Sequence, residues 1–150
     1  MAGLRIGVPR NYFFEGVDTE IQRAFEEALE TLRKLGAEVR DVRIPSMQRA
    51  HSFLLILVSE AFAYHERDLR ERPELYGEVA RERLLAGALV TASEYTQAQR
   101  IRAEICAETA AVMRDVDVLA TPTTLKPATP FTVAHDPELG FPEATWRRSI

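Results

Sequence analysis

The chain has 150 residues, a length typical of one globular domain. Hydrophobic residues make up 46% and charged residues 28%, a balance that excludes wholesale disorder. The formal net charge of -4 argues against nucleic-acid binding, which requires an excess of positive charge over the phosphates. No apolar run approaches the ~18 residues of a membrane span, and the single cysteine, Cys106, excludes an internal disulfide. We therefore expect a cytoplasmic protein that binds neither nucleic acid nor membrane.

The N-terminal third begins with a predicted strand and helix. Residues 4–8 alternate between apolar and other side chains, and Pro9 ends this strand. Asp18 suits the N-cap of a helix over 18–35, and Gly36 suits its left-handed C-terminal cap. The helix has one apolar stripe at helical spacing, which comprises Ile21, Phe25, Ala28, Leu29, Leu32 and Leu35.

A second strand is predicted over 37–44. Val39 and Val42 fall on opposite faces of it, so the strand needs either a bulge or burial on both faces. Strand, helix and strand within 45 residues form a βαβ unit. This unit predicts a parallel strand pair with a right-handed crossover.

The middle of the chain predicts helices. Residues 47–67 are apolar nearly all round, which is typical of a helix buried on most sides. Residues 66–76 are rich in charge and predict a surface turn, followed by a short helix over 78–86 that ends at Gly87. The predicted fold class is α/β, with helix predominating.

A long helix and a short strand follow. Thr91 and Glu94 have capping-box spacing and open a helix that extends to about residue 114. A buried strand is predicted over 116–120, and a proline-rich, irregular tail over 122–150. The apolar stripe of the long helix comprises Tyr95, Ala98, Ile101, Ile105, Thr109 and Val112.

The sequence holds no complete hydrolytic site. None of its serines lies in a glycine-flanked elbow that exposes the hydroxyl, and its seven glycines are all isolated. A phosphate cradle and a Gly-rich oxyanion loop are therefore both excluded. Cys106, in the middle of the long helix near its apolar stripe, predicts an inert structural thiol.

Charged residues predict surface roles and no metal site. The three histidines are far apart, and His65 with Asp68 is a common surface arrangement. Salt-bridge spacing on the first helix explains carboxylates such as Glu26, with Glu30 and Arg33. Two pairs of arginines lie two residues apart on helices, so one member of each pair can face inward; these are Arg81 with Arg83 and Arg100 with Arg102.

Several stretches in order resemble the second half of the amidase signature family. The resemblance covers residues 3–131, and its strength lies in the order of the pieces, since no single piece is diagnostic. The pieces are Leu4-Arg5-Ile6-Gly7-Val8-Pro9, Tyr12-Phe13, Leu32-Arg33-Lys34-Leu35-Gly36-Ala37-Glu38-Val39, Arg83-Leu84-Leu85-Ala86-Gly87, Tyr95 and Ala98 to Arg102, and Asp117-Val118-Leu119-Ala120-Thr121-Pro122-Thr123-Thr124.

The resemblance implies amide hydrolysis, or release of ammonia from glutamine in the tRNA-dependent amidotransferase branch. Such proteins use a Ser–cis-Ser–Lys triad without a metal or cofactor. The lysine and the Gly/Ser-rich signature that carry this triad belong to the family's first half. They have no counterpart here, because Lys34 and Lys126 match non-catalytic positions. The family's closing Asn-x-x-Gly-x-Pro pattern is also missing.

We therefore expect one partial domain over residues 1–150, an internal piece from the C-terminal half of an amidase. It is expected to contribute to a mixed sheet flanked by helices, and to be inactive alone. In the whole protein the partner is a small amide substrate. The isolated chain is expected to self-associate or to pair with the missing N-terminal half. The alternative is a free-standing α/β interaction or binding module derived from an amidase.

One substrate-binding residue is implied by the resemblance. In the glutamine-specific branch, an arginine four residues before the motif's glycine helps to hold the substrate carboxylate, and Arg83 has that place relative to Gly87. Glu82 stands where that branch has a second basic residue. That branch also has an aromatic-rich stretch around the position of Tyr95, which is the only aromatic residue there in this sequence. These two departures favour a general amidase. A structural salt bridge is the alternative role for Arg83.

Overall fold

The computed structural model describes residues 1–128, which fall into two compact units. Among the described residues, the first unit comprises Met1–Pro45 together with residues 109–128, and the second comprises Ser46–Glu108. Residues 122–128 form neither helix nor strand, and the rest of the predicted proline-rich tail lies outside the described residues. A single partial domain over 1–150 remains a prediction.

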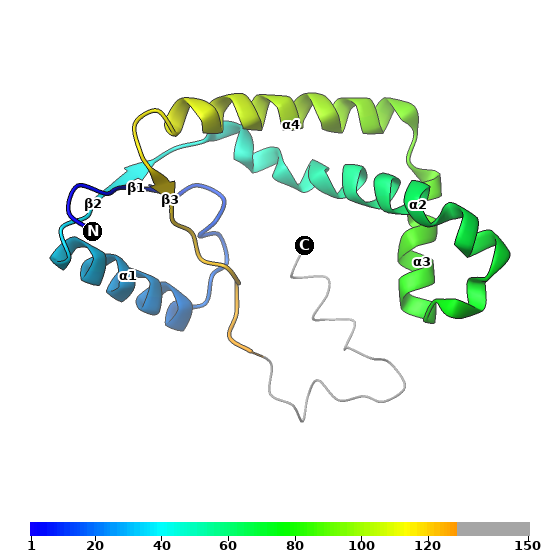
Figure 1. Ribbon diagram of the computed structural model, residues 1–150, viewed down its shortest axis with the longest axis horizontal. Coiled ribbons are helices and arrows are strands. Elements are labelled where there is room, and N and C mark those ends of the chain that lie inside the picture. Colours follow the sequence, from blue (N-terminus) through cyan, green and yellow to red (C-terminus); the bar gives the residue numbers. More distant parts are fainter. Residues whose placement is uncertain (129–150) are drawn as a thin grey trace. The chain divides into compact units, whose positions relative to one another are not determined.

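A three-stranded parallel sheet is the centre of the first unit (Figure 1). Its strands are β1 (Arg5–Pro9), β2 (Glu38–Val42) and β3 (Val118–Leu119), in the order β2-β1-β3. This confirms the α/β fold class and the parallel pair of the βαβ unit. The core of this unit includes the fully buried side chains of Val8 and Val116.

The second strand is shorter than predicted and has a regular register. It pairs with β1 residue for residue, from Arg5 opposite Glu38 to Pro9 opposite Val42. Val39 and Val42 are both half-buried, so burial on both faces, without a bulge, accounts for the pattern. The strand ends before Ile44 because the backbone of Ile44 forms hydrogen bonds with the Asn11 side chain instead of a neighbouring strand. The Asn11 amide donates to the Ile44 carbonyl at 2.7 Å and accepts from the Ile44 N–H at 3.2 Å.

Helix α1 (Thr19–Lys34) has the ends that the sequence predicts. The Asp18 side chain accepts a hydrogen bond from the backbone N–H of Glu20 at 2.8 Å, which satisfies one of the free donors of the first turn. Gly36 has a φ of 91°, and the two backbone hydrogen bonds of a Schellman motif close the helix there.

The apolar stripe of α1 is only partly buried. Leu29 is 1% exposed, and Phe25 is half-buried with its ring edge-on to that of Phe14 at 5.2 Å between centroids. Ala28 and Leu35 are exposed, so the prediction is wrong for these two residues. Leu35 is 57% exposed because it is the C-cap, where the backbone leaves the helical path.

The second unit begins with a 3₁₀ segment, η1 (Pro45–Ser52), followed by helix α2 (Phe53–Glu71). The prediction of a surface turn over 66–76 is wrong for residues 66–71, which belong to the helix. Ion pairs between charged side chains four residues apart stabilise this end of the helix. Within this helix only Ile56 and Leu69 are buried, so the prediction of burial on most sides is also wrong. Its exposed apolar and aromatic side chains include Phe53, Leu57 and Tyr64.

Two further helices complete the second unit. A single 3₁₀ turn, η2 (Pro73–Leu75), precedes α3 (Glu78–Ala86), whose bounds match the prediction. The 3₁₀ turn η3 (Gly87–Leu89) then leads to α4 (Ala92–Val112).

The capping box of α4 is formed as predicted. Glu94 N–H donates to the Thr91 hydroxyl at 3.2 Å, and Thr91 N–H donates to the Glu94 carboxylate at 2.8 Å. The predicted stripe of α4 is buried at Ala98 and half-buried at its other positions. In the described part of the chain, no helix has the length and apolar character needed to cross a bilayer.

Candidate functional site

Arg83, the predicted substrate-binding residue, lies in the last turn of α3. Its side chain is exposed, whereas that of Arg81 is half-buried. The two arginines therefore differ in exposure, as the two-residue spacing on a helix predicts. Arg83 is the more exposed residue of the pair.

Gly87, the C-cap of α3, lets the end of this helix pack closely against α2. A Cβ atom at this position would lie 2.0 Å from the carbonyl oxygen of Val58 and 2.6 Å from the Cβ of Phe62. Both distances are below any tolerated contact, so only glycine permits this approach. Because Gly87 follows Arg83 by four residues, this contact fixes the helix end that carries the arginine.

Hydrogen bonds between side chains hold the neighbouring helices of the second unit. The Tyr95 hydroxyl donates to Glu60 at 2.9 Å, which ties α4 to α2, and it accepts from the Gln99 amide of its own helix at 2.8 Å. His65 Nδ1 lies 2.9 Å from the Tyr76 hydroxyl and links α2 to the segment before α3. Sequence spacing carries no signal for the Tyr95–Glu60 and His65–Tyr76 contacts, since the partners come from different elements.

The predicted His65–Asp68 arrangement separates into two contacts. His65 pairs with Tyr76, while the Asp68 carboxylate accepts a hydrogen bond from Arg72 at 2.5 Å. That hydrogen bond is the main cause of the lowered pKa of Asp68. No group of three His, Cys, Asp or Glu side chains within residues 1–128 is placed to hold a metal ion.

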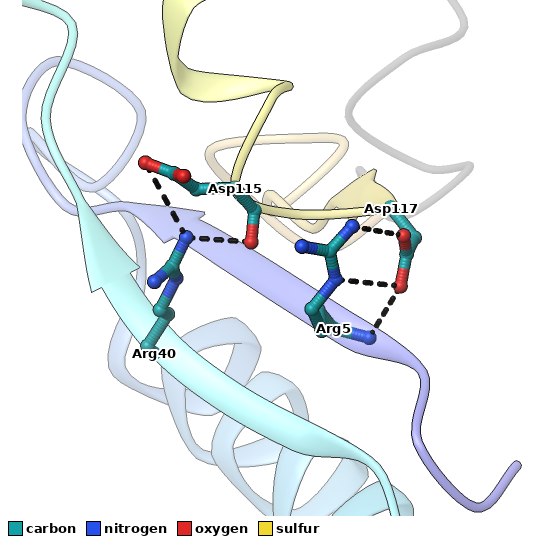
Figure 2. Close-up of polar contacts among 4 residues, drawn as sticks. All are labelled: Arg5, Arg40, Asp115 and Asp117. Atoms are coloured by element: carbon teal, nitrogen blue, oxygen red, sulfur yellow. Dashed lines mark hydrogen bonds and ion pairs between the residues drawn. The ribbon is translucent and has the colours of Figure 1, made fainter.

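Four charged residues hold β3 and the residues before it against the sheet of the first unit (Figure 2); they are Arg5, Arg40, Asp115 and Asp117. Asp117 accepts from the Arg5 backbone N–H at 2.8 Å and from its Nη2 at 2.7 Å, while Arg40 Nη2 donates to the Asp115 carbonyl at 2.6 Å. The hydrogen bond from the Arg5 side chain is the main cause that lowers the pKa of Asp117, and it raises the pKa of Arg5.

Other sequence expectations for charged and nucleophilic residues have mixed outcomes. Glu30 pairs with Arg33 at 3.6 Å as predicted, whereas Glu26 pairs with Arg10, which also stacks over the Phe14 ring. Cys106 is exposed, so its predicted place near the apolar stripe does not bury the thiol.

Two serine hydroxyls of the second unit make hydrogen bonds within the fold. The Ser46 hydroxyl donates to Glu108, and the Ser59 hydroxyl donates to the Leu55 carbonyl of its own helix. Both hydroxyls are therefore engaged in structural contacts. The substrate-binding role of Arg83 stays a prediction: its residue is exposed, and a guanidinium matches a carboxylate in shape and charge.

A solved structure of an amidase shares the α/β arrangement of this chain. It matches the family Amidase over residues 1–143, and it belongs to that family.

Two relatives and one solved structure show the extent of the likeness. The chain is 44% identical over 127 residues to an amidase of Pseudomonas putida, covering 84% of this chain and 27% of that protein. It is 31% identical to one component of the glutamyl-tRNA(Gln) amidotransferase of Geotalea daltonii, covering 84% of this chain and 31% of that protein. A crystal structure of an amidase superposes with a TM-score of 0.78 at 32% identity, over 89% of this chain and 31% of that one. The chain thus spans about three tenths of the length of these relatives.

Proposed function

We propose that this chain is a segment of an enzyme that hydrolyses an amide C–N bond, and that the segment is inactive alone. The match to the family over residues 1–143, with 44% identity to the Pseudomonas putida amidase, carries this proposal. The resemblance implies a Ser–cis-Ser–Lys triad, and the 150 residues contain no Gly/Ser-rich stretch that could supply its serines. A cytoplasmic location belongs to the same proposal, and a single cysteine suits a reducing compartment.

Arg83 is proposed to face the substrate of the whole enzyme. Its exposure and the rigid seat of its helix at Gly87 support this role, because a carboxylate is best held by a guanidinium whose backbone is fixed. The substrate class that follows is a small amide that carries a carboxylate. Glutamine fits this class, and so do other amides of dicarboxylic acids.

A chimeric enzyme tests the proposal. The 127-residue segment of the Pseudomonas putida amidase that aligns with this chain is replaced by the corresponding residues of this chain, and amide hydrolysis is followed by ammonia release. We expect the chimera to hydrolyse amides and the isolated chain to show no turnover. A chimera that folds yet lacks activity would favour the interaction or binding module.

The role of Arg83 is tested within the same chimera. We expect Arg83→Ala to lower kcat/KM by about 10- to 100-fold for an amide that carries a carboxylate, the loss expected for a charge-assisted hydrogen bond. A neutral amide should be hydrolysed as before. Arg100→Ala, which removes another exposed arginine of the second unit, is the matched control. An equal loss on both amides would assign Arg83 to a structural salt bridge.

A further inference from the structure

The helical segment that leads into α2 has an unusual form. It is the 3₁₀ helix η1, which runs for eight residues, although 3₁₀ runs longer than three or four residues are uncommon. It continues directly into α2, since Ser52 at the junction has right-handed helical angles, with a φ of -61° and a ψ of -18°. A 3₁₀ helix of this length therefore calls for contacts that favour it over the α-helix.

Helix α4 supplies two such contacts within the second unit. The backbone N–H and the hydroxyl of Ser46 both donate to Glu108 Oε2, at 2.8 Å and 2.6 Å. Arg49 forms an ion pair with Glu104, which lies one turn before Glu108 on α4. Ser46 is 4% exposed, whereas the side chains of Arg49 and Glu104 are substantially exposed. The two pairs thus join η1 to α4 at one buried and one exposed point.

The spacing of the two pairs matches a 3₁₀ helix. Three residues of a 3₁₀ helix make one full turn and rise about 6 Å, so Ser46 and Arg49 lie on the same face. The step from Glu104 to Glu108 on α4 also rises about 6 Å, because an α-helix rises about 1.5 Å per residue. In an α-helix, Ser46 and Arg49 would be about 4.5 Å apart along the axis and turned by about 60°. Both pairs therefore form together best while η1 keeps its 3₁₀ form.

The sequence of η1 is itself compatible with an α-helix. Its middle consists of four residues with high α-helix propensity, which are Met47, Gln48, Arg49 and Ala50. Pro45 stands at the first position, where an α-helix also tolerates proline. Since α2 is already helical, its extension by these residues avoids the cost of nucleation. The α-helix also has the better hydrogen-bond geometry, so release of the two pairs favours the α-helical form.

We propose that residues 46–52 are a conformational switch, which Glu104 and Glu108 hold in the 3₁₀ form and which winds into an α-helix continuous with α2 when these contacts are released. Neutralisation of Glu108 is the step that releases them. It weakens both hydrogen bonds from Ser46, because they lose their ionised acceptor. The result is a longer α2, with its new first turns built from η1.

The charges around Glu108 set the direction of the response to acid. From η1, Ser46 and Arg49 face this carboxylate, and Glu104 precedes it by one turn on α4. The pKa of Glu108 is lowered, first by the hydrogen bond from the Ser46 hydroxyl and then by that from its backbone N–H. The 3₁₀ form is therefore favoured at neutral pH, and this preference is lost as the pH falls through the lowered pKa.

Nuclear magnetic resonance of the full, isotope-labelled chain tests the switch through couplings across hydrogen bonds, which identify the acceptor carbonyl of each amide. The N–H of Ala50 donates to the carbonyl of Met47 in a 3₁₀ helix and to that of Ser46 in an α-helix. We expect the coupling to Met47 in the unsubstituted chain at neutral pH. In Glu108→Ala, and in the unsubstituted chain as the pH is lowered, a coupling to Ser46 should replace it.

A second variant and two matched controls complete the test. Arg49→Ala breaks the exposed pair with Glu104, and it should shift the coupling in the same direction even if Glu108→Ala does not fold. Ser59→Ala removes a hydroxyl that bonds within α2, and Arg100→Ala removes an exposed arginine of α4, so both should keep the coupling to Met47. The proposal is overturned if that coupling persists in every folded variant of the two pairs. Its loss without a new coupling to Ser46, or an equal change in the controls, also overturns it.

Discussion

At the scale of single residues, Gly87 shows how a missing side chain sets the packing of two helices. A methyl group there would overlap the Val58 carbonyl, and backbone cannot move aside as a flexible side chain can. We expect Gly87→Ala to lower the free energy of unfolding by about 1–3 kcal/mol, the usual cost of overpacking. Urea denaturation measures this change. Gly77→Ala is the control, since no atom lies within 4 Å of the added methyl group, and a comparable loss there would contradict the packing argument.

The Arg5–Asp117 pair gives the first unit a specific dependence on pH. The folded-state pKa of Asp117 is lowered, so its contribution is present above the unfolded-state pKa and is lost as the pH falls through the folded-state value. We expect the urea midpoint of the unsubstituted chain to fall as the pH is lowered. The midpoint of Asp117→Asn should fall less over the same pH range. Both side chains are substantially exposed, so solvent screening limits the size of the effect. An Asp117→Asn variant whose urea midpoint falls in acid as far as that of the unsubstituted chain would contradict this prediction.

The residues that the sequence predicts correctly act over short spans of chain. Asp18, Gly36 and the Thr91–Glu94 pair close helix ends against backbone a few residues away, so local spacing identifies them. Asp117 pairs with a residue 112 positions away, and Glu108 with one 62 positions away. Among 23 acidic and 19 basic side chains, no spacing distinguishes these partners. The prediction that Arg83 binds the substrate came from the family resemblance alone.

At the scale of elements, α1 contains a matched pair of leucines with opposite environments. Leu29 is 1% exposed and Leu35 is 57% exposed, although both belong to the predicted stripe. We expect Leu29→Ala to destabilise the chain by about 2–5 kcal/mol through loss of buried surface and a residual cavity. Leu35→Ala should change stability by less than about 0.5 kcal/mol, as is usual for surface positions. Denaturant midpoints of both variants test the burial of the stripe, and equal losses would contradict it.

Helix α2 shows what periodicity can and cannot predict. The apolar residues of its first half correctly predicted a helix. They also predicted burial, but Phe53 and Leu57 are exposed. Burial depends on what lies against the helix, which a single sequence does not contain. Its charged second half suggested a turn by composition. The side chains instead form pairs one turn apart and extend the helix to Glu71.

At the scale of the whole molecule, the parallel sheet has two outer strands that each pair with β1 alone within the described residues. Outer strands present unpaired N–H and C=O groups, which recruit further strands. We expect the isolated chain to self-associate with rising concentration, measured by multi-angle light scattering. Val118→Lys should reduce this association, because a charge on β3 opposes strand addition.

Val79→Lys is the control for that experiment. It places the same charge at an exposed valine that belongs to helix α3 and not to a strand. If it reduced association as much as Val118→Lys, the contact would be a general apolar one and not a strand edge. A chain that stays monomeric at every concentration would contradict the prediction outright.

The order in which the strands appear along the chain has a consequence for synthesis on the ribosome. β1 and β2 are separated by one helix, but β3 begins at Val118, well after β2 ends at Val42. At a translation rate of 5–20 residues per second, this interval takes roughly 4–15 s. During that time the nascent β1–β2 pair exposes the β1 edge that β3 will later occupy. A chaperone that binds extended edges would meet this chain in that window, before the Arg5–Asp117 pair can form.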